Sequence, residues 1–509
     1  MNASIPASAI DLDKTTAEPT PQEIRAVFFG LMIVMGLGAL DQSIVATALP
    51  RIVGDLGGIA HLSWVVTAYV LASTAVMPLY GKLSDQYGRR PMIYVAVLIF
   101  LLGSALSGAA QTLTQLILFR AIQGLGAGGL LPLSQIVIGD LLPPAERGRR
   151  QGSIVAVFAA CSVIGPVIGG VITDLLSWHW IFYINLPVGA VALFVVAKAL
   201  RRPQLAKTTR VDYLGSALLT AAATAFLLVL TMGGSEWPWT SPQVAGASAL
   251  AAALTILFVL HVRRTPEPVL PLDLFRNRLF VVASIVMTLA FMGLLGASVF
   301  FPLFFQIVMG VSPARSGFLT GPMMIGVVVS SIVNGRVFLR SGRYKPAQIG
   351  GLSLAVAAFA VLAWGAATAQ AFMVIEPAIV ALGLGLGLVM PNMTIAVQNA
   401  LPAAHRGVGT ATLAFFRSLG GVIGVAGSGA ILAQRLHAAA AADPASLANA
   451  GAQAIAALPP AAQTAAIAVY RDAIAITFTA GVCIVAAALV ALLFLPELPL
   501  TGRPPSTRA

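Results

Sequence analysis

Two charged residues stand inside long apolar runs of this sequence, where lipid rather than water is the expected surrounding. Asp41 follows the stretch VFFGLMIVMGLGAL, and Arg120 follows LTQLILF. An aspartate at the centre of a membrane-spanning helix costs about 2.5–3.5 kcal/mol on insertion scales. Because desolvation disfavours the charged form of a carboxyl group, such a residue can take up a proton near neutral pH. Asp41 is therefore the first candidate for a proton-binding carboxylate. The alternative is a carboxylate that caps a neighbouring helix.

The two arginines inside apolar runs are Arg120 and Arg417. A guanidinium is always charged, so each needs a counter-ion or carbonyl acceptors when it is buried. For Arg120 the simplest interpretation is a fixed counter-ion or a donor to backbone carbonyls. Arg417 either lines a central cavity or holds two parts of the molecule together, and the sequence leaves both open.

A third polar cluster, GKLSDQYGRR at residues 81–90, lies between two apolar runs. Gly81 and Gly88 permit a tight turn. Asp85 is suited to lie against the positive N-terminal end of another helix. Arg89 and Arg90 add two positive charges. The alternative interpretation is an ordinary basic turn that anchors the ends of two helices.

The composition indicates that these residues belong to a membrane protein. Of 509 residues, 58% are hydrophobic and 9% charged, with a mean hydropathy of +0.91, whereas soluble domains carry about 25% charged residues. The net charge of +12 fits basic loops at one membrane face and does not require nucleic acid as a partner. The two cysteines, Cys161 and Cys483, have no ligand spacing, and no phosphate-binding loop occurs. The sequence therefore predicts no metal and no cofactor.

Fourteen apolar stretches have the length of roughly 20 residues that crosses a bilayer. They lie at 26–48, 62–80, 91–110, 113–139, 152–174, 180–198, 212–232, 243–262, 279–306, 315–337, 347–366, 371–397, 407–433 and 473–495. With the N-terminus inside, most of the 30 Lys and Arg fall in cytoplasmic segments. The exceptions outside are Arg51, Arg315, Arg435 and Arg471. This bias predicts that both termini are cytoplasmic.

The loops contain a weak internal repeat. GKLSDQYGRR matches GRVFLRSGRY at 335–344, and the segment 146–170 matches 405–429. The repeat pairs the first six predicted helices with the last six and leaves two as an insert. It predicts a cytoplasmic tail (1–24), an N-terminal six-helix bundle (25–200), a linker with two inserted helices (201–265), a C-terminal six-helix bundle (266–497) with an extracytoplasmic loop at 434–472, and a second tail (498–509). The second copy has Leu339 where an aspartate would stand, which predicts no equivalent cluster there.

Several motifs together resemble the major facilitator superfamily, and within it the drug:proton antiporters with fourteen helices. GKLSDQYGRR is similar to the superfamily signature between its second and third helices. The antiporter resemblance rests on LDQSIVATALP (40–50), RAIQGLGAGG (120–129), GPVIGG (165–170), SWHWIFYINLPVG (177–189) and FFRSLGGVIGVAG (415–427). The resemblance implies an all-α integral membrane protein with fourteen transmembrane helices, in two six-helix halves with a two-helix insert.

The resemblance also implies roles for particular residues. Asp85 would face the helix that begins near Arg406, and Arg89 or Arg90 would pair with Asp140, forming a lock between the halves. Arg120 would couple protonation of Asp41 to conformational change. In the family, the bend at GPVIGG favours antiport over symport; its residues here are Gly165, Pro166, Gly169 and Gly170. The predicted substrate cavity includes Gln123, Phe301, Gln306, Asn392, Phe416 and Arg417.

The implied function is export of amphipathic, often cationic small molecules in exchange for protons. The alternative is export of one endogenous metabolite, such as an amino acid or siderophore, by the same machinery. A membrane enzyme would require clustered His, Asp or Glu, and the sequence has five His in all. The Ala-rich, Arg-rich composition suggests a bacterial inner membrane. Relatives in double-membrane cells often use a periplasmic adaptor and an outer-membrane channel, and no segment of this chain indicates such partners.

Overall fold

The computed structural model describes residues 20–56, 62–199, 212–234, 237–311, 313–336, 344–368, 372–440 and 459–497. Within these ranges the chain is mostly helical and forms no β-strand. Fourteen of its helices or helix pairs are long and apolar enough to span a membrane, which confirms the predicted number. Most of the loop copy at 335–344, including Leu339, lies outside the described residues.

The N-terminal half contains the first six spans. Its helices are α1 (Pro21–Leu56), α2 (Leu62–Tyr87), α3 (Arg89–Gly108), α4 (Leu113–Leu141), α5 (Pro144–Leu175), α6 (Trp180–Tyr183) and α7 (Asn185–Ala199). The short α6 and α7 together make the sixth span.

The C-terminal half contains the last six spans. They are α10 (Arg278–Leu303) with the π-helical segment η4 (Phe304–Val308), α11 (Pro313–Arg336), α12 (Lys345–Ala367), α13 (Phe372–Ala400), α14 (Arg406–Ala440) and α16 (Pro460–Leu493). The 3-10 helix η3 (Leu272–Arg276) leads into α10.

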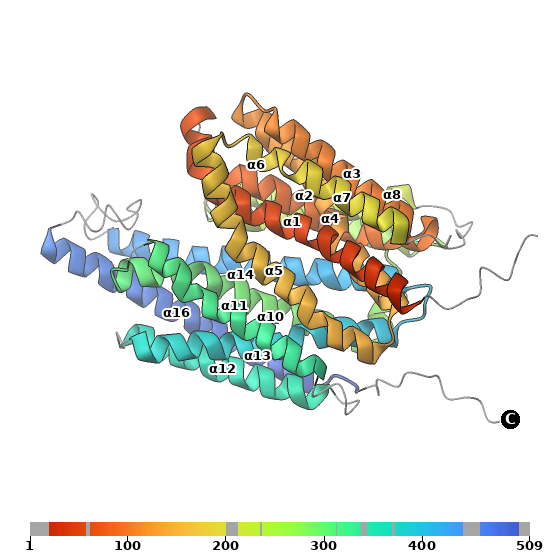
Figure 1. Cartoon of the computed structure of the whole chain (residues 1–509). Helices are drawn as coiled ribbons and strands as arrows, with labels where there is room; N and C mark the ends of the chain where they lie inside the picture. Colours follow the sequence, from red (N-terminus) through yellow and green to blue (C-terminus); the bar gives the residue numbers. More distant parts are fainter. Residues whose placement is uncertain are drawn as a thin grey trace, which may run out of the picture.

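The two halves repeat one packing pattern (Figure 1). In the N-terminal half α1 packs on α5, and α2 and α3 pack on α4; in the C-terminal half α10 packs on α14, and α11 and α12 pack on α13. Each half also has an apolar core of its own. The weak sequence repeat therefore corresponds to a repeated fold of two six-helix halves.

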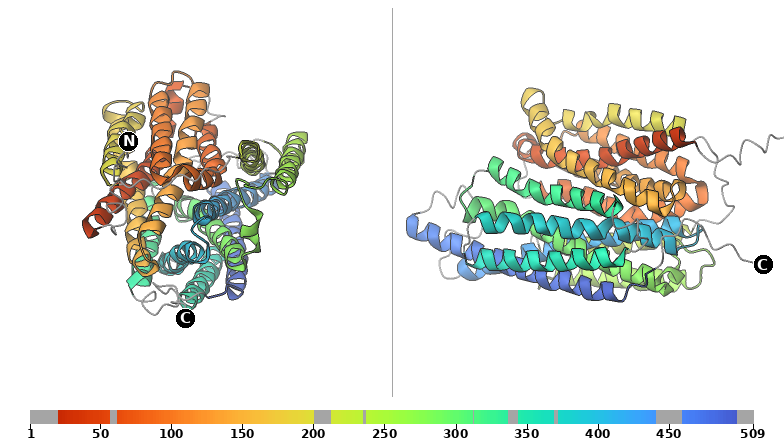
Figure 2. Two further views of the ribbon diagram at one scale, coloured as in Figure 1. Left: turned by 90° about the vertical axis from the view of Figure 1, so that its right-hand side faces the viewer. Right: turned by 60° about the horizontal axis from the view of Figure 1, so that its bottom comes forward.

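The halves meet through equivalent helices, with α2 against α14 and α5 against α11. The two inserted helices, α8 (Tyr213–Met232) and α9 (Pro242–Val262), pack on each other beside the bundle (Figure 2). Because α8 also contacts both α2 and α14, the insert touches both halves.

The helices flanking the predicted loop at 434–472 are longer than expected. The helix α14 continues to Ala440, and α16 already begins at Pro460. Alanine has the highest helix propensity, so the Ala-rich sequence extends each helix beyond its membrane span. Pro460 fits the first turn of α16 because its missing N–H would have no helical partner there.

We call the end of the bundle where α2 ends and α3 begins the basic end, and the other the opposite end. Helix α1 starts and α16 finishes at the basic end (Figure 1). The helix ends gathered there carry most of the described Lys and Arg. This charge distribution is the structural counterpart of the bias seen in the sequence.

Candidate functional site

The intramembrane Asp41 and Arg120 form a fully buried ion pair. Arg120 Nη1 donates to Asp41 Oδ2 at 2.7 Å, and the side chains are 1% and 0% exposed. A buried charge is tolerated only when it is paired and hydrogen-bonded. Removing one partner of such a pair costs about 3–5 kcal/mol, because the other charge remains buried.

Neutral amides complete the surroundings of the Asp41 carboxylate. Gln123 Nε2 and Asn185 Nδ2 each donate to Asp41 Oδ1 at 2.7 Å. Arg120 Nη1 also donates to Gln123 Oε1 at 2.7 Å, and Asn185 donates to Ser104 Oγ at 2.9 Å. We call these five residues the Asp41 network. They come from α1, α3, α4 and α7, so the whole network lies in the N-terminal half.

An aromatic face covers Arg120. The guanidinium carbon lies 4.1 Å from the centre of the Tyr69 ring, and Arg120 Nε donates to the carbonyl of Val65 at 3.4 Å. Both residues belong to the first turns of α2. A cation over an aromatic face gains about 0.5–2 kcal/mol, more when it is desolvated. The first turns of α2 therefore contact the charge pair directly.

The charge pair lies nearer the opposite end than the basic end. Arg120 is the eighth residue of α4, about 10 Å along the axis at 1.5 Å per residue. The same helix reaches the basic end with Asp140 as its penultimate residue. One rigid helix therefore carries a member of the Asp41 network and a member of the cluster described next.

At the basic end, Arg89 bridges two carboxylates. Arg89 Nε donates to Asp140 Oδ2 at 2.9 Å, and Nη1 donates to Asp85 Oδ1 at 2.5 Å. Nη1 also donates to Ser84 Oγ at 2.7 Å. We call these residues the Arg89 cluster. Of the two predicted arginines, Arg89 pairs with Asp140; Arg90 instead lies over the ring of Tyr94 at 5.7 Å.

The two glycines of GKLSDQYGRR serve different purposes. Gly88 separates α2 from α3 with φ of 94°, a backbone conformation that favours glycine. Gly81 lies inside α2, and a β-carbon there would be 2.9 Å from the carbonyl oxygen of Gly407. The prediction that both glycines form the turn is therefore wrong for Gly81, which allows α2 to approach α14.

Asp85 joins the two halves directly. Its Oδ2 accepts from the backbone N–H of Val408 at 3.0 Å, in the first turn of α14. A carboxylate at a helix N-terminus satisfies a free N–H and interacts favourably with the helix dipole. Asp85 thus contacts the helix that the family resemblance indicated.

A second group of polar contacts also connects the halves at the basic end. Gln398 of α13 donates to the carbonyl of Gln135 at 3.0 Å, and Arg147 Nη1 donates to Gln398 Oε1 at 3.4 Å. Arg406 Nη1 lies 3.4 Å from Asp140 Oδ1. Burial and the charge of Arg406 lower the pKa of Arg147 to about 10, against the opposing effect of Asp140. Arg147 therefore remains charged at neutral pH.

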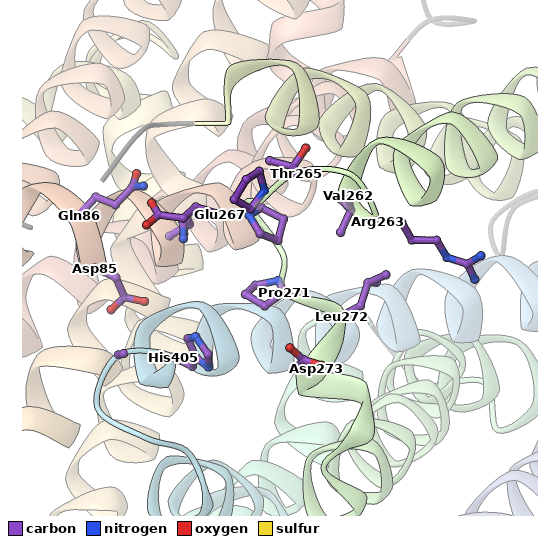
Figure 3. Close-up of a pocket in the computed structure, with 14 residues that line it drawn as sticks. Asp85, Gln86, Val262, Arg263, Thr265, Glu267, Pro271, Leu272, Asp273 and His405 are labelled. Carbon is purple, nitrogen blue, oxygen red and sulfur yellow. The ribbon is translucent and has the colours of Figure 1, made fainter. Parts of the chain in front are cut away.

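A cavity of about 420 Å³ opens beside the Arg89 cluster (Figure 3). Asp85 and Gln86 line it from the N-terminal half, and His405 lines it from the C-terminal half. Glu267 and Pro271, from the connection between α9 and η3, form a third wall. The insert and both halves thus border the same space.

The predicted antiporter motif lies inside α5. A β-carbon at Gly165 would collide with Ser43 of α1, so this glycine permits close packing of α5 on α1. Pro166 lies within the helix. Gly169 accepts a hydrogen bond from Thr173 at 2.6 Å, and Gly170 faces open space.

The predicted cavity residues have diverse surroundings. Gln123 belongs to the Asp41 network. Phe301 is 0% exposed in the C-terminal core and packs on Phe478, and Asn392 is 1% exposed and donates to Asn334 Oδ1 at 3.1 Å. The structure differs from the prediction here, because these three side chains are enclosed and border no open space in this conformation. Gln306, Phe416 and Arg417 are half-buried.

Comparison with known proteins decides the family. The family model described as "Major Facilitator Superfamily" matches residues 31–425. The chain belongs to the major facilitator superfamily.

Two relatives in Bacillus subtilis (strain 168) are similar along most of their length. "Multidrug transporter protein MdtP" is 39% identical over 427 residues, covering 83% of this chain and 78% of the relative. "Multidrug resistance protein 3" is 37% identical over 414 residues, covering 81% of this chain and 80% of the relative. The chain is thus a multi-pass membrane transporter related to multidrug transporters.

Solved structures agree on the major facilitator fold. The proton:xylose symporter XylE has a TM-score of 0.61 at 14% identity, covering 94% of this chain and 97% of that one. The human organic anion transporter MFSD10 has a TM-score of 0.62 at 15% identity, covering 92% of this chain and 100% of that one.

Sequence analysis missed several residues of this transporter's polar clusters. They are Ser104, Asn185, Tyr69, Ser84, Gln135, Arg147 and Gln398. Asn185 and Gln398 are neutral amides in apolar segments, which was the available signal. It was insufficient because single amides in membrane helices also form ordinary packing contacts.

Proposed function

We propose that this transporter exports amphipathic, often cationic compounds in exchange for protons. The observation that carries the proposal is the buried ion pair of Asp41 and Arg120. Asp41 is a titratable group enclosed in the N-terminal half, whose charge is stabilised by one guanidinium and two amides. The names of the two Bacillus relatives support the multidrug part of the proposal.

Protonation of Asp41 would remove the counter-ion of Arg120. The guanidinium would then be buried without an anionic partner, which is unfavourable in a low-dielectric interior. Gln123 and Asn185, which donate to the carboxylate, would lose a charged acceptor at the same time. Protonation therefore favours a different arrangement of α1, α4 and α7.

Two helices connect this change to the far end of the molecule. Helix α4 carries Arg120 and Asp140, and α2 carries Tyr69 and Asp85; the two helices pack on each other along their length. A shift at the Asp41 network would therefore be transmitted to the Arg89 cluster. In this mechanism the two halves rock about a central site and expose it alternately to the two faces of the membrane.

We place the basic end at the cytoplasm, in accord with the positive-inside rule, and the transporter in the bacterial inner membrane. The structure, with the halves joined at the basic end, then corresponds to a cytoplasm-closed state. The Asp41 network lies nearer the outer face, from which protons would enter. The partners we propose for a double-membrane host are a periplasmic adaptor and an outer-membrane channel.

The test is substrate-triggered proton flux in liposomes that contain a trapped pH dye. With an inward proton gradient, addition of ethidium to wild-type protein should accelerate proton movement. Asp41→Asn should abolish the response, because the amide cannot be protonated. Asp472→Asn is the control, since Asp472 is exposed and forms a surface ion pair with Arg435.

The contrary outcomes are distinct. Full coupling in Asp41→Asn would mean that another group takes the proton. If no compound in a broad panel moves protons through the wild type, the multidrug proposal fails. A response to a single metabolite in that panel would favour the specific exporter instead.

A further inference from the structure

Arg417 is the second arginine within the membrane-spanning part of the molecule, and the mechanism above does not use it. It is the twelfth residue of α14, about 16 Å along the helix axis from the basic end. Arg417 is therefore near the middle of the span Arg406–Leu432.

Arg417 differs from Arg120 in its surroundings. Arg120 has Asp41, Gln123 and the Val65 carbonyl as acceptors. For Arg417, no carboxylate of a described residue lies within ion-pairing distance, and no described group accepts a hydrogen bond from it. Its neighbour is the face of Phe291, whose centre is 5.0 Å from the guanidinium carbon.

The Arg417 side chain leaves α14 between the surface that packs on α2 and the surface that packs on α10. Ser418 contacts Met77 of α2 in the other half. Gly420 and Gly424 pack on the backbone of α10, at Thr288 and Met292. Since successive helical residues are 100° apart, position 417 lies between the direction of α2 and that of α10. Arg417 is thus placed where the two halves meet.

An arginine in this position requires an anion. The residue is half-buried. Charged residues within membrane spans almost always face a bundle interior or water-filled cavity and find a partner. Among the described residues of the spans, Asp41 is already paired with Arg120, and Glu376 of α13 forms no ion pair with Arg417. The partner of Arg417 must therefore come from outside the described chain.

We infer that Arg417 binds an anionic group of the transported compound. A carboxylate, sulfonate or phosphate would accept charge-assisted hydrogen bonds from the guanidinium, and the apolar part would pack on Phe291. This inference rests on the proposed export function and adds to its substrate class amphipathic compounds with an acidic group, including zwitterions. A purely cationic compound would bind without this contact.

The experiment compares two dyes that differ at one group. Rhodamine 110 carries a free carboxyl group, and rhodamine 123 is its methyl ester. Export of each dye is measured in liposomes under a proton gradient, and stabilisation of the detergent-purified protein by each dye is measured through the thermal unfolding midpoint. The variants are Arg417→Gln and, as a matched control, Arg435→Gln, whose arginine is exposed.

Wild type should favour the acid over the ester. Arg417→Gln should reduce this preference roughly 10- to 100-fold, as expected when one charge-assisted contact is lost, while Arg435→Gln retains it. Equal loss of both dyes in Arg417→Gln, or an unchanged preference, would overturn the assignment and leave the export function standing.

The binding measurement separates the two proposals. If wild type exports neither these dyes nor any compound of the broad panel, the export function fails, but stabilisation by the acid that disappears in Arg417→Gln would still support the anion site. Absence of any acid-specific stabilisation in the wild type would overturn the anion site.

Discussion

At the residue scale, Arg89 keeps two carboxylates together at the basic end. Asp85 and Asp140 both accept from its guanidinium, and Asp85 also accepts from the first turn of α14. Without Arg89 the two carboxylates would repel each other, and Asp85 would lose the partner that fixes its orientation. The contact of Asp85 with α14 thus depends on the Arg89 side chain.

We therefore expect Arg89→Ala to destabilise the closed basic end by about 3–5 kcal/mol, as for a buried ion pair that loses one partner. Labelling of an introduced cysteine at Gln398 by a membrane-impermeant maleimide, in a background without native cysteines, should become faster. Arg90→Ala is the control, because Arg90 contacts the Tyr94 ring and pairs with no carboxylate of the described residues. Equal labelling in the two variants would contradict the role given to Arg89.

The sequence identified Asp41 and Arg120 because charges in apolar runs are conspicuous. It could not predict that they pair, since they are 79 residues apart and the contact depends on how α1 packs against α4. Gln123 was assigned to a substrate cavity, but it donates to Asp41. An amide fits either environment, and only the three-dimensional neighbours distinguish them.

At the element scale, helices were predicted well where a long apolar run ends in charged or turn residues. The break between α6 and α7 in the sixth span, and the π-helical η4 after α10, were not predicted. Both occur inside continuous apolar sequence, where hydropathy carries no information about backbone geometry. The inserted α8 and α9 were predicted as spans, but their contact with both halves was not.

The insert is fixed at the basic end through Asp212. Its carboxylate caps α8 by accepting a hydrogen bond from Gly215 N at 2.8 Å. The same carboxylate lies 2.7 Å from His261 Nε2 and accepts a hydrogen bond from Val269 N at 3.3 Å. Burial by itself would raise the pKa of Asp212, but the hydrogen bonds from His261, Gly215 and Val269 lower it below its ordinary value. The charged form is thus stabilised in the folded protein.

A carboxylate with a lowered pKa adds stability above its unfolded pKa of about 3.9, and this stability disappears as the pH falls through the folded value. Asp212→Asn should therefore lower the thermal unfolding midpoint at pH 7, with a loss of about 1–2 kcal/mol. The difference from wild type should shrink at acid pH. Asp273→Asn, at an exposed ion pair with Arg276, should change little. An equal deficit for Asp212→Asn at both pH values would show that its charge is unimportant.

At the scale of the whole molecule, the hydrogen bonds between described residues of the two halves lie between the basic end and the middle of the bundle. They join α2 with α14, α4 with α13 and α14, and α5 with α13. Helix α5 also approaches α11 there, where a β-carbon at Gly152 would lie 3.3 Å from Ile332 Cβ. Alternating access requires these contacts to separate in each cycle.

Cysteines at positions 152 and 332 should therefore form a disulfide, since bridged β-carbons are typically about 3.5–4.5 Å apart and a separation of the two helices by a few tenths of an ångström brings this pair into that range. In a Cys161→Ser, Cys483→Ser background, oxidation of Gly152→Cys/Ile332→Cys should reduce transport at least about 10-fold, because a covalent link prevents separation of the halves. A reductant should restore transport, and each single-cysteine variant should be unaffected by oxidation. Undiminished transport by fully cross-linked protein would refute the rocking of the halves.

The Asp41 network belongs wholly to the N-terminal half, whereas Arg417 and Phe291 belong to the C-terminal half. The two halves can therefore accumulate mutations under different constraints. Selection for growth in a new toxic compound should enrich substitutions around Arg417 and leave Asp41 and Arg120 unchanged. On the proposed mechanism, a duplicated ancestral bundle whose copies had diverged in this way could acquire new substrates without having to evolve its energy source again.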